Sequence, residues 1–337
     1  MTRIFCAFLL ICCCLPAHAA RYHVSATAAP GKSGKKWNRA MQLHEALRLA
    51  TAGDEIWVAR GVYRTSEQAD RAASFVVPAG VRLYGGFAGN ERHLKQRHPD
   101  AQSTLTGELG GRHDRSDNAY SVVRLRANGR LSSTLDGFHI NGGCGQSYTD
   151  GFAARNAGGG LYIEPNATAP SSHLINNCTF EDNYAHNGGA VYVGGGNPVF
   201  TNCIFVANTA DFHGGAVYNN GRGTNAGPTF EQCSFIDNAS NSGAGMTNDG
   251  RDGQASPLLV SCKFIDNISL INGAAIFNIQ DETGVCEPVL EDCTFLGNES
   301  ILGDDIAEQG EGAGAEKVGD APGKRGGTLR PVVSKRR

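Results

Sequence analysis

The chain has 337 residues, of which 40% are hydrophobic and 45 are glycine, so it can bury a large core and has an excess of turn residues. Its charge is uneven: the net charge is +6 over residues 20–115, −14 over residues 116–309 and +4 over residues 310–337. An acidic central region argues against a nucleic-acid partner and against binding an acidic polysaccharide without calcium, although such a surface also serves solubility alone.

Residues 1–19 have the pattern of a secretory signal peptide. Arg3 precedes an apolar run over residues 4–15, and Ala17-His18-Ala19 supplies small residues for cleavage after Ala19. Lipidation at one of three consecutive cysteines, residues 12–14, is an alternative, but no small residue precedes them. No later segment reaches the roughly 18 uninterrupted apolar residues of a membrane span. The sequence therefore predicts an exported protein, either secreted, periplasmic or at the cell surface.

Residues 20–134 are predicted to form an N-terminal cap and the first coils of a repeat. Apolar residues at positions 43, 46, 47 and 50 follow helical spacing, with Asn38 as the expected N-cap and Gly53 as the expected stop. Short strands are expected at residues 55–59, 74–77, 81–84 and 120–125. An amphipathic helix is a suitable cover for the open edge of a first coil.

Residues 135–309 contain the regular repeat. The phrase Cys-x-Phe-x-x-Asn occurs five times, at steps of 25, 30, 29 and 31 residues, and a Gly-Gly-Ala-Val-Tyr phrase alternates with it. The repeated positions are Cys178, Cys203, Cys233, Cys262 and Cys293; Phe180, Phe205, Phe235, Phe264 and Phe295; and Asn183, Asn208, Asn238, Asn267 and Asn298. Two strand-like phrases per repeat, with no helical phrase between them, indicate a β-solenoid, and the leucine pattern of a horseshoe repeat is absent.

In such a solenoid each coil lies about 4.8 Å above the previous one, so that equivalent residues stack in ladders. Strand alternation places the repeated Cys and Phe on one face, which we expect to be the interior. The repeated Asn is expected at a turn, where its amide donates to the carbonyl oxygen of the next Asn. The fold class predicted from these ladders is all-β.

Seven cysteines remain after the signal peptide. Five are ladder positions, which favours small buried apolar side chains over disulfides, and seven is an odd number. Cys144 and Cys286 lie outside the ladder and are the two candidates for other chemistry. No zinc spacing is present, so no metal site is predicted.

The sequence resembles bacterial right-handed parallel β-helix repeat proteins, including polymorphic outer-membrane proteins, which share the pectate-lyase-like superfold. The resemblance covers residues 21–306 and depends on the paired Phe-x-x-Asn and Gly-Gly-Ala-Val phrases, on Leu135-Asp-Gly-Phe-His-Ile-Asn-Gly-Gly143, and on Tyr84-Gly-Gly-Phe87. It implies a right-handed parallel β-helix with an N-terminal capping helix. Members of the outer-membrane family usually continue into a membrane-inserted domain, so a passenger fragment lacking its membrane anchor is one interpretation of the chain.

The same superfold also carries polysaccharide lyases and glycoside hydrolases, so the resemblance leaves a catalytic site open. Asp237 and Asp266 occupy the same position in consecutive coils, where stacked carboxylates require a proton or a cation such as calcium between them. Solvated turn residues are the alternative interpretation. His186 and His213 precede their glycine pairs in adjacent coils and are candidate neighbours for metal binding or proton transfer. Apart from possible calcium, no cofactor is predicted.

Tyr162, Tyr192 and Tyr218 end the glycine phrase in three consecutive coils. If Val191 and its equivalents point inward, the tyrosines face out and form a strip suited to stacking sugar rings; if the tyrosines point inward, they are core. We expect the exposed arrangement.

These features predict a secreted or cell-envelope protein that binds a glycan or protein partner without catalysis, in the manner of an adhesin. A lyase or glycoside hydrolase is the alternative. Residues 310–337 are predicted to be a disordered basic tail, with no evident cap for the last coil. The sequence does not specify a ligand or an oligomeric state.

Overall fold

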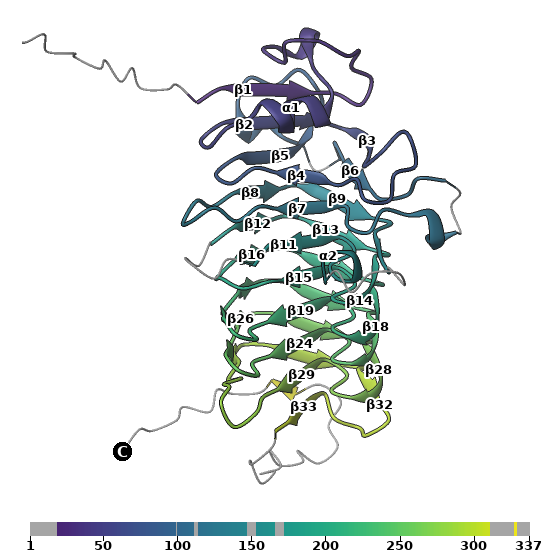
Figure 1. Ribbon diagram of the computed structural model, residues 1–337, viewed down its shortest axis with the longest axis vertical. Coiled ribbons are helices and arrows are strands. Elements are labelled where there is room, and N and C mark those ends of the chain that lie inside the picture. Colours follow the sequence, from purple (N-terminus) through teal and green to yellow (C-terminus); the bar gives the residue numbers. More distant parts are fainter. Residues whose placement is uncertain are drawn as a thin grey trace, which may run out of the picture.

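The computed structural model describes residues 19–98, 100–110, 114–146, 153–165, 172–310 and 327–328. The predicted signal peptide, except for Ala19, and most of the predicted tail lie outside these residues. The chain forms an elongated stack of short strands, with the N-terminal strands at one end and the last coil at the other (Figure 1).

The strands form four long parallel sheets, named A to D, and one small sheet of β20 (Asn225–Ala226) and β25 (Gln254–Ala255). Sheet A contains β1 (Arg21–Val24), β2 (Glu55–Ala59), β5 (Arg82–Phe87), β8 (Thr134–Asp136), β12 (Leu174–Asn176), β16 (Val199–Thr201), β21 (Thr229–Glu231), β26 (Leu258–Val260) and β30 (Val289–Glu291). Sheet B contains β3 (Gly61–Arg64), β6 (Ser103–Thr106), β9 (Phe138–Asn141), β13 (Thr179–Glu181), β17 (Ile204–Val206), β22 (Ser234–Ile236), β27 (Lys263–Ile265), β31 (Thr294–Leu296) and β34 (Gly327–Thr328).

Sheet C contains β4 (Phe75–Val77), β7 (Val123–Leu125), β11 (Leu161–Ile163), β15 (Val191–Val193), β19 (Val217–Asn220), β24 (Met246–Asp249), β29 (Ile276–Ile279) and β33 (Ile306–Gln309). Sheet D contains β10 (Cys144–Gly145), β14 (Tyr184–Asn187), β18 (Thr209–His213), β23 (Ala239–Ser242), β28 (Ile268–Asn272) and β32 (Glu299–Ser300). Among the described residues, the strand pairs are parallel except for β31 with β34, which is antiparallel.

Consecutive strands visit the sheets in the order A, B, D and C before the next coil begins. One coil comprises β12, β13, β14 and β15, and the next comprises β16, β17, β18 and β19. Each strand pairs with its equivalent in the following coil, as β13 does with β17. This is the arrangement of a β-solenoid, and it explains the repeat of 25–31 residues because one repeat is one coil.

The corners between sheets have a left-handed backbone at three positions per coil, for example at Asn177, Asp182 and Gly188. The residue before the ladder Asn has φ of 49° at Asp182, 53° at Ala207, 51° at Asp237 and 52° at Asp266. Gly tolerates this conformation best because it has no Cβ atom. Asp and Asn come next because their short polar side chains can hydrogen-bond locally. The turn geometry alone therefore accounts for the recurrence of Asp before Asn in this sequence.

The interior contains the aromatic ladder expected from the repeat. The ring centroids of Phe180, Phe205, Phe235, Phe264 and Phe295 lie 5.2, 4.8, 4.5 and 5.2 Å apart in that order. A second stack, Phe200 on Phe230 at 4.7 Å, lies beside it. Burial of each Phe contributes about 1.5–3 kcal/mol, so this ladder is a main source of stability. The seven described cysteines are buried and free, and none forms a disulfide.

The ladder asparagines form a buried chain of amides along the solenoid. The Nδ2 of each donates to the Oδ1 of the next, at 3.1 Å for Asn183–Asn208, 3.1 Å for Asn208–Asn238, 2.9 Å for Asn238–Asn267 and 2.8 Å for Asn267–Asn298. The same Nδ2 also donates to the Phe carbonyl of the preceding coil, as Asn208 does to Phe180 at 2.9 Å. The amides of Asn183, Asn208, Asn238 and Asn267 thus have partners for both their donors and their acceptor, which removes the penalty of burying them.

The helical segment near the N-terminus differs in its bounds from the prediction. Helix α1 spans Leu43–Leu49, begins after Gln42 and buries Leu43, Ala46 and Leu47. Asn38 is instead inside a 3-10 turn, η1 (Trp37–Arg39), so it is not the N-cap, and the helix ends before Gly53. The described residues also include the 3-10 turns η2 (Leu94–Gln96) and η3 (Arg115–Asp117) and the short helix α2 (Ala153–Asn156).

The first strand of sheet A has no free outer edge. The backbone N of His23 donates to the Gly34 carbonyl at 2.7 Å, and the N of Met41 donates to the His23 carbonyl at 2.9 Å. The intervening segment covers β1, and α1 packs near it (Figure 1). At the other end, β30, β32 and β33 are the last strands of their sheets, while the last strand of sheet B, β31, pairs with β34. Across the described residues, no helix is both long and apolar enough to cross a membrane.

Candidate functional site

Asp237 and Asp266, the predicted catalytic or calcium-binding candidates, are exposed corner residues with left-handed backbone. Their backbone N atoms donate to the carbonyls of Ile265 and Leu296 at 3.1 and 2.9 Å, as the corner requires. In the part of the chain that the structure describes, no group of three or more His, Cys, Asp or Glu side chains is arranged to hold a metal ion. The backbone geometry gives these two residues a structural role at the corner, and a part for their carboxylates in calcium binding or catalysis stays a prediction.

The tyrosine strip is buried, so the expectation that it is exposed is wrong. Tyr162, Tyr192 and Tyr218 are only 5%, 9% and 7% exposed, and their rings stack at centroid distances of 5.1 and 5.6 Å. They do point away from the main core, since Val191 faces inward. Side chains from later coils cover them: Asn220 donates to the Tyr192 hydroxyl at 2.7 Å, and the Tyr218 hydroxyl donates to Asp249 at 2.6 Å. A sugar ring has no access to these faces.

A buried ion pair completes this covered row. The Arg251 guanidinium donates to both oxygens of Asp249, at 2.8 and 2.6 Å, and the Asp249 side chain is fully buried. Burial alone raises the pKa of the Asp249 carboxyl, but hydrogen bonds from Arg251 and Tyr218 outweigh it and leave that pKa lowered. Burial also raises the pKa of the Tyr218 hydroxyl. The Asp249–Arg251 pair therefore stays charged and holds the loop that contains Arg251 over the tyrosine rings.

His213 belongs to this row and not to a histidine pair. Its ring stacks on Tyr218 at 6.3 Å and on Phe277 at 6.0 Å, beside the position where Thr247 interrupts the aromatic row. Its Nδ1 is buried without a hydrogen-bond partner, and burial lowers the pKa of the imidazole. The ring fills space as a neutral aromatic group.

His186 instead forms a hydrogen bond with Asp211 on sheet D. Its Nδ1 lies 2.6 Å from Oδ2 of Asp211, and the Tyr184 hydroxyl donates to the other oxygen of the same carboxylate. The guanidinium of Arg115 lies over the Tyr184 ring, 5.7 Å from its centroid, and pairs with Asp182. The predicted proximity of His186 and His213 is thus replaced by a His–Asp–Tyr cluster, which sequence spacing did not indicate because Asp211 is in no repeated phrase.

Cys144 lies next to this cluster and is not activated. It is buried, and burial raises the pKa of its thiol. The other cysteine outside the ladder, Cys286, is also buried, which raises its pKa to about 12. A thiolate is the reactive form of cysteine, so neither residue has the environment of a nucleophile.

The same face carries an exposed apolar surface that the sequence interpretation missed. Six large hydrophobic side chains there are between 48% and 78% exposed. We call this surface the sheet-D patch, and its members are Phe212, Ile268, Leu270, Ile271, Ile301 and Leu302. They come from β18, from β28 and from the turn after β32, where the N of Leu302 donates to the Ile271 carbonyl at 3.3 Å.

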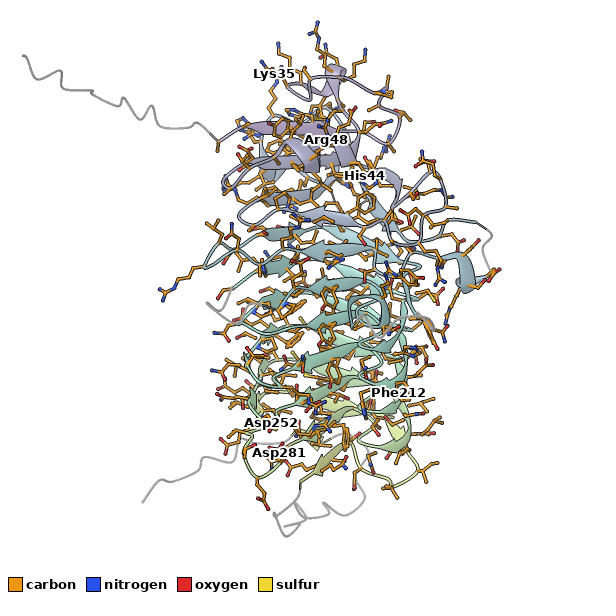
Figure 2. The ribbon with its side chains drawn as sticks, in the orientation of Figure 1. Lys35, His44, Arg48, Phe212, Asp252 and Asp281 are labelled. Carbon is orange, nitrogen blue, oxygen red and sulfur yellow. The ribbon has the colours of Figure 1, made fainter. Side chains whose placement is uncertain are left out.

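Phe212 projects from the side of the solenoid formed by sheet D (Figure 2). The His186 ring lies 5.6 Å from it, so the patch adjoins the His–Asp–Tyr cluster. The sequence signal was the pair of apolar runs at residues 268–271 and 301–302, which lie outside the repeated Cys, Phe and Asn positions. Exposed apolar side chains gathered on one side of a folded protein usually mark an interaction site.

Comparison with models of protein families gives no match to this chain, and comparison with curated proteins also gives none.

Proposed function

We propose that the chain is an exported right-handed parallel β-helix, capped by α1, that binds a protein partner through sheet D without catalysis. The signal-like residues 1–19 and the repeat resemblance support the export and the handedness. The observation that carries the binding function is the sheet-D patch, six exposed hydrophobic side chains on one side of the solenoid. Repeat solenoids commonly use such an extended side for partner binding.

A protein partner fits this surface better than a glycan. Five of the six patch residues are aliphatic, whereas sugar rings stack on aromatic faces, and the aromatic row of sheet C is covered. The exposed carboxylates of Glu299 and Asp304 flank the aliphatic turn. The complementary surface is therefore apolar at its centre and basic at its rim.

Site-specific photo-crosslinking tests this proposal. A photoreactive residue at Leu270 of the full chain should capture a discrete protein from the cell envelope, whereas the same residue at the equally exposed Val62 should not. The captured protein is then purified, and its Kd for the chain is measured. Leu270→Ser/Ile271→Ser should raise that Kd by about 30- to 1,000-fold, since central hydrophobic contacts contribute about 1–2 kcal/mol each and about 1.4 kcal/mol is a factor of ten.

Val62→Ser/Leu131→Ser is the matched control, because it also removes two exposed hydrophobic side chains. An unchanged Kd in Leu270→Ser/Ile271→Ser, with an unchanged melting temperature, would exclude the sheet-D patch as the binding site.

The His186–Asp211–Tyr184 cluster supports a second candidate function, a polysaccharide lyase or glycoside hydrolase. A carboxylate that orients an imidazole and also accepts from a phenol is a common arrangement for proton transfer. The test is a screen for release of unsaturated or reducing sugars, with and without calcium. Activity lost in Asp211→Asn but kept in Asp237→Asn/Asp266→Asn would assign the chemistry to sheet D, and the reverse result would assign it to the corner carboxylates. No sugar release from any polysaccharide would leave the binding function.

A further inference from the structure

The N-terminal end of the solenoid is strongly basic. Residues 20–53 contain six basic residues and one acidic residue. Within the described residues, five of the basic side chains are exposed and form no ion pair, namely Lys32, Lys35, Lys36, Arg39 and Arg48. The one acidic side chain, Glu45, accepts a hydrogen bond from the N of Gly31 at 3.0 Å.

The C-terminal end is strongly acidic. Residues 281–309 contain nine acidic residues and no basic residue. Eight of the nine are exposed, and none of the nine forms an ion pair with another described residue; they are Asp281, Glu282, Glu287, Glu291, Asp292, Glu299, Asp304, Asp305 and Glu308. Carboxylates gathered in this way repel one another unless a cation or a basic surface lies against them.

The two charged regions lie at opposite ends of the long axis. Figure 2 shows Lys35 and Arg48 at the end of the solenoid that contains β1. Asp281 lies close to the opposite end, which contains β33. The backbone hydrogen bonds of β1 are closed by the segment from Gly34 to Met41, so the basic end does not offer strand pairing. Contact at the basic end therefore has to come from side chains.

We infer that the protein associates end to end with a second copy of itself, with the basic N-terminal end of one copy against the acidic C-terminal coils of the next. Contact between two basic ends or two acidic ends is disfavoured by repulsion, so charge favours the head-to-tail arrangement among end-to-end contacts. Such a contact joins two different surfaces. Every pair of molecules therefore still has one free basic end and one free acidic end, and association continues into a line of molecules. A line of this kind repeats the sheet-D patch along its length, which multiplies the sites available to a partner with several binding positions.

Sedimentation of the full chain at two salt concentrations tests the contact. At an ionic strength of about 20 mM the wild-type protein should associate with increasing concentration, and at about 200 mM its Kd should be at least about tenfold higher, because salt screens charges across this distance. Wild-type protein that remains monomeric at low salt overturns the proposal; the acidic end is then left to other groups, such as the chain's own basic residues 310–337. Association that does not respond to salt also overturns it.

Charge reversal at each end identifies the surfaces. Lys35→Glu/Lys36→Glu/Arg39→Glu should remain monomeric at low salt, and so should Glu291→Lys/Asp292→Lys/Glu299→Lys. An equimolar mixture of the two variants should associate again, since each supplies the end that the other has lost. Failure of the mixture, when both variants keep the wild-type melting temperature, contradicts a head-to-tail contact.

Arg126→Glu/Arg130→Glu/Arg222→Glu is the matched control. It changes the net charge by the same amount through exposed residues that follow β7 and β19, in the middle coils. It should associate like the wild type, and loss of association in this variant would mean that net charge, and not the end surface, controls self-association.

Discussion

The ladder asparagine is the residue on which each coil most depends. Asn238 lies in the middle of the chain of amides, where its Oδ1 accepts from both the N and the Nδ2 of Asn208, at 3.0 and 3.1 Å. Its own Nδ2 donates to the Phe205 carbonyl at 3.0 Å and to Asn267 at 2.9 Å. Loss of this amide removes the partner of the N and of one Nδ2 hydrogen of Asn208, and one donor to the Phe205 carbonyl, in a region that water does not reach. Asn267 keeps the backbone N of residue 238 as a donor to its Oδ1.

Asn238→Ala should therefore lower the free energy of unfolding by about 3 kcal/mol or more, since each unsatisfied buried group costs about 1–3 kcal/mol. Asp237→Asn, one residue earlier at the exposed corner, should change it by less than about 0.5 kcal/mol, because Asn also tolerates the left-handed backbone. Urea unfolding of both variants measures the contrast. Equal losses in the two variants would show that the corner, and not the amide ladder, governs stability here.

His173 makes the stability depend on pH. The residue is fully buried, its Nδ1 accepts from the N of Ser133 at 3.1 Å, and burial lowers the pKa of the imidazole to about 4. The folded state thus holds the ring neutral, while the unfolded state takes up a proton near pH 6.5. Between these two values the unfolded chain binds more protons, so the free energy of unfolding falls as the pH falls from about 6.5 to about 4.

The contribution of His173 over this range is about 3 kcal/mol, from a lowering of about 2.5 pKa units at 1.36 kcal/mol each. His173→Asn keeps an acceptor for Ser133 and has no titratable group, so its unfolding free energy should decline less between pH 6.5 and 4 than that of the wild type. Urea unfolding at a series of pH values measures the two slopes. Parallel curves would mean that His173 is not held neutral in the fold.

At the scale of the element, the corner between sheets B and D sets the shape of each coil. Four coils have a non-glycine residue with positive φ there, and one of the four is Ala207. Alanine has neither the freedom of glycine nor the local hydrogen bonds of Asp or Asn in this conformation. The corner at Ala207 is therefore strained relative to the equivalent corners at Asp182 and Asp237.

Ala207→Gly and Ala207→Asn should each raise the free energy of unfolding, by about 0.5–1 kcal/mol, and Ala207→Val should lower it by at least as much. A glycine normally destabilises a regular strand, so a gain in stability is diagnostic of the left-handed corner. Thermal and urea unfolding of the three variants tests the order. A destabilised Ala207→Gly variant would mean that the residue does not need positive φ.

The same scale explains which elements the sequence predicted. The Phe and Asn ladders were predictable because parallel strands in register place each repeated residue on its own copy in the next coil. The bounds of α1 were not predictable. The helix begins at Leu43, where packing on the first strands begins, and Asn38 can act chemically as an N-cap but lies outside that packing. Propensity was overridden by tertiary contact.

The candidate site was less predictable, because its residues are not repeated. Strand alternation placed Tyr192 opposite Val191 correctly, but burial of the tyrosine comes from Asn220 in the next coil, which no periodicity signals. The Asp211 carboxylate joins His186 to Tyr184 across neighbouring strands, and its partners are separated from it by 25 and 27 residues in sequence. Contacts between non-repeated positions follow from the three-dimensional fold, and no periodicity in the sequence predicts them.

At the scale of the whole molecule, the two ends differ in more than charge. The N-terminal coil is closed by the segment from Gly34 to Met41 and by α1, whereas β30, β32 and β33 each lack a further strand in the described residues. The last coil also carries the least buried phenylalanine of the ladder, Phe295, which is 6% exposed, while Phe205, Phe235 and Phe264 are fully buried. In a solenoid each coil is stabilised mainly by its neighbours, so the coil with one neighbour is the weakest.

Opening should therefore begin at the C-terminal end. Hydrogen–deuterium exchange at an ionic strength of about 200 mM should be fastest in β30 to β33 and slowest in the central strands β17 and β22, because central strands exchange only by larger openings. The N-terminal strand β2 should be better protected than β33, since its edge is covered. Exchange that starts at β1 and β2, or that is uniform along the solenoid, would contradict this order.

Salt then connects local stability to self-association. If a second copy covers the acidic end, the exchange of β30 to β33 should slow at low ionic strength and high protein concentration, while that of β17 should not change. The change should vanish in Glu291→Lys/Asp292→Lys/Glu299→Lys, which presents a basic surface at that end. Protection that increases equally in the central strands would point to general stabilisation by low salt, and would separate that effect from a contact confined to the last coil.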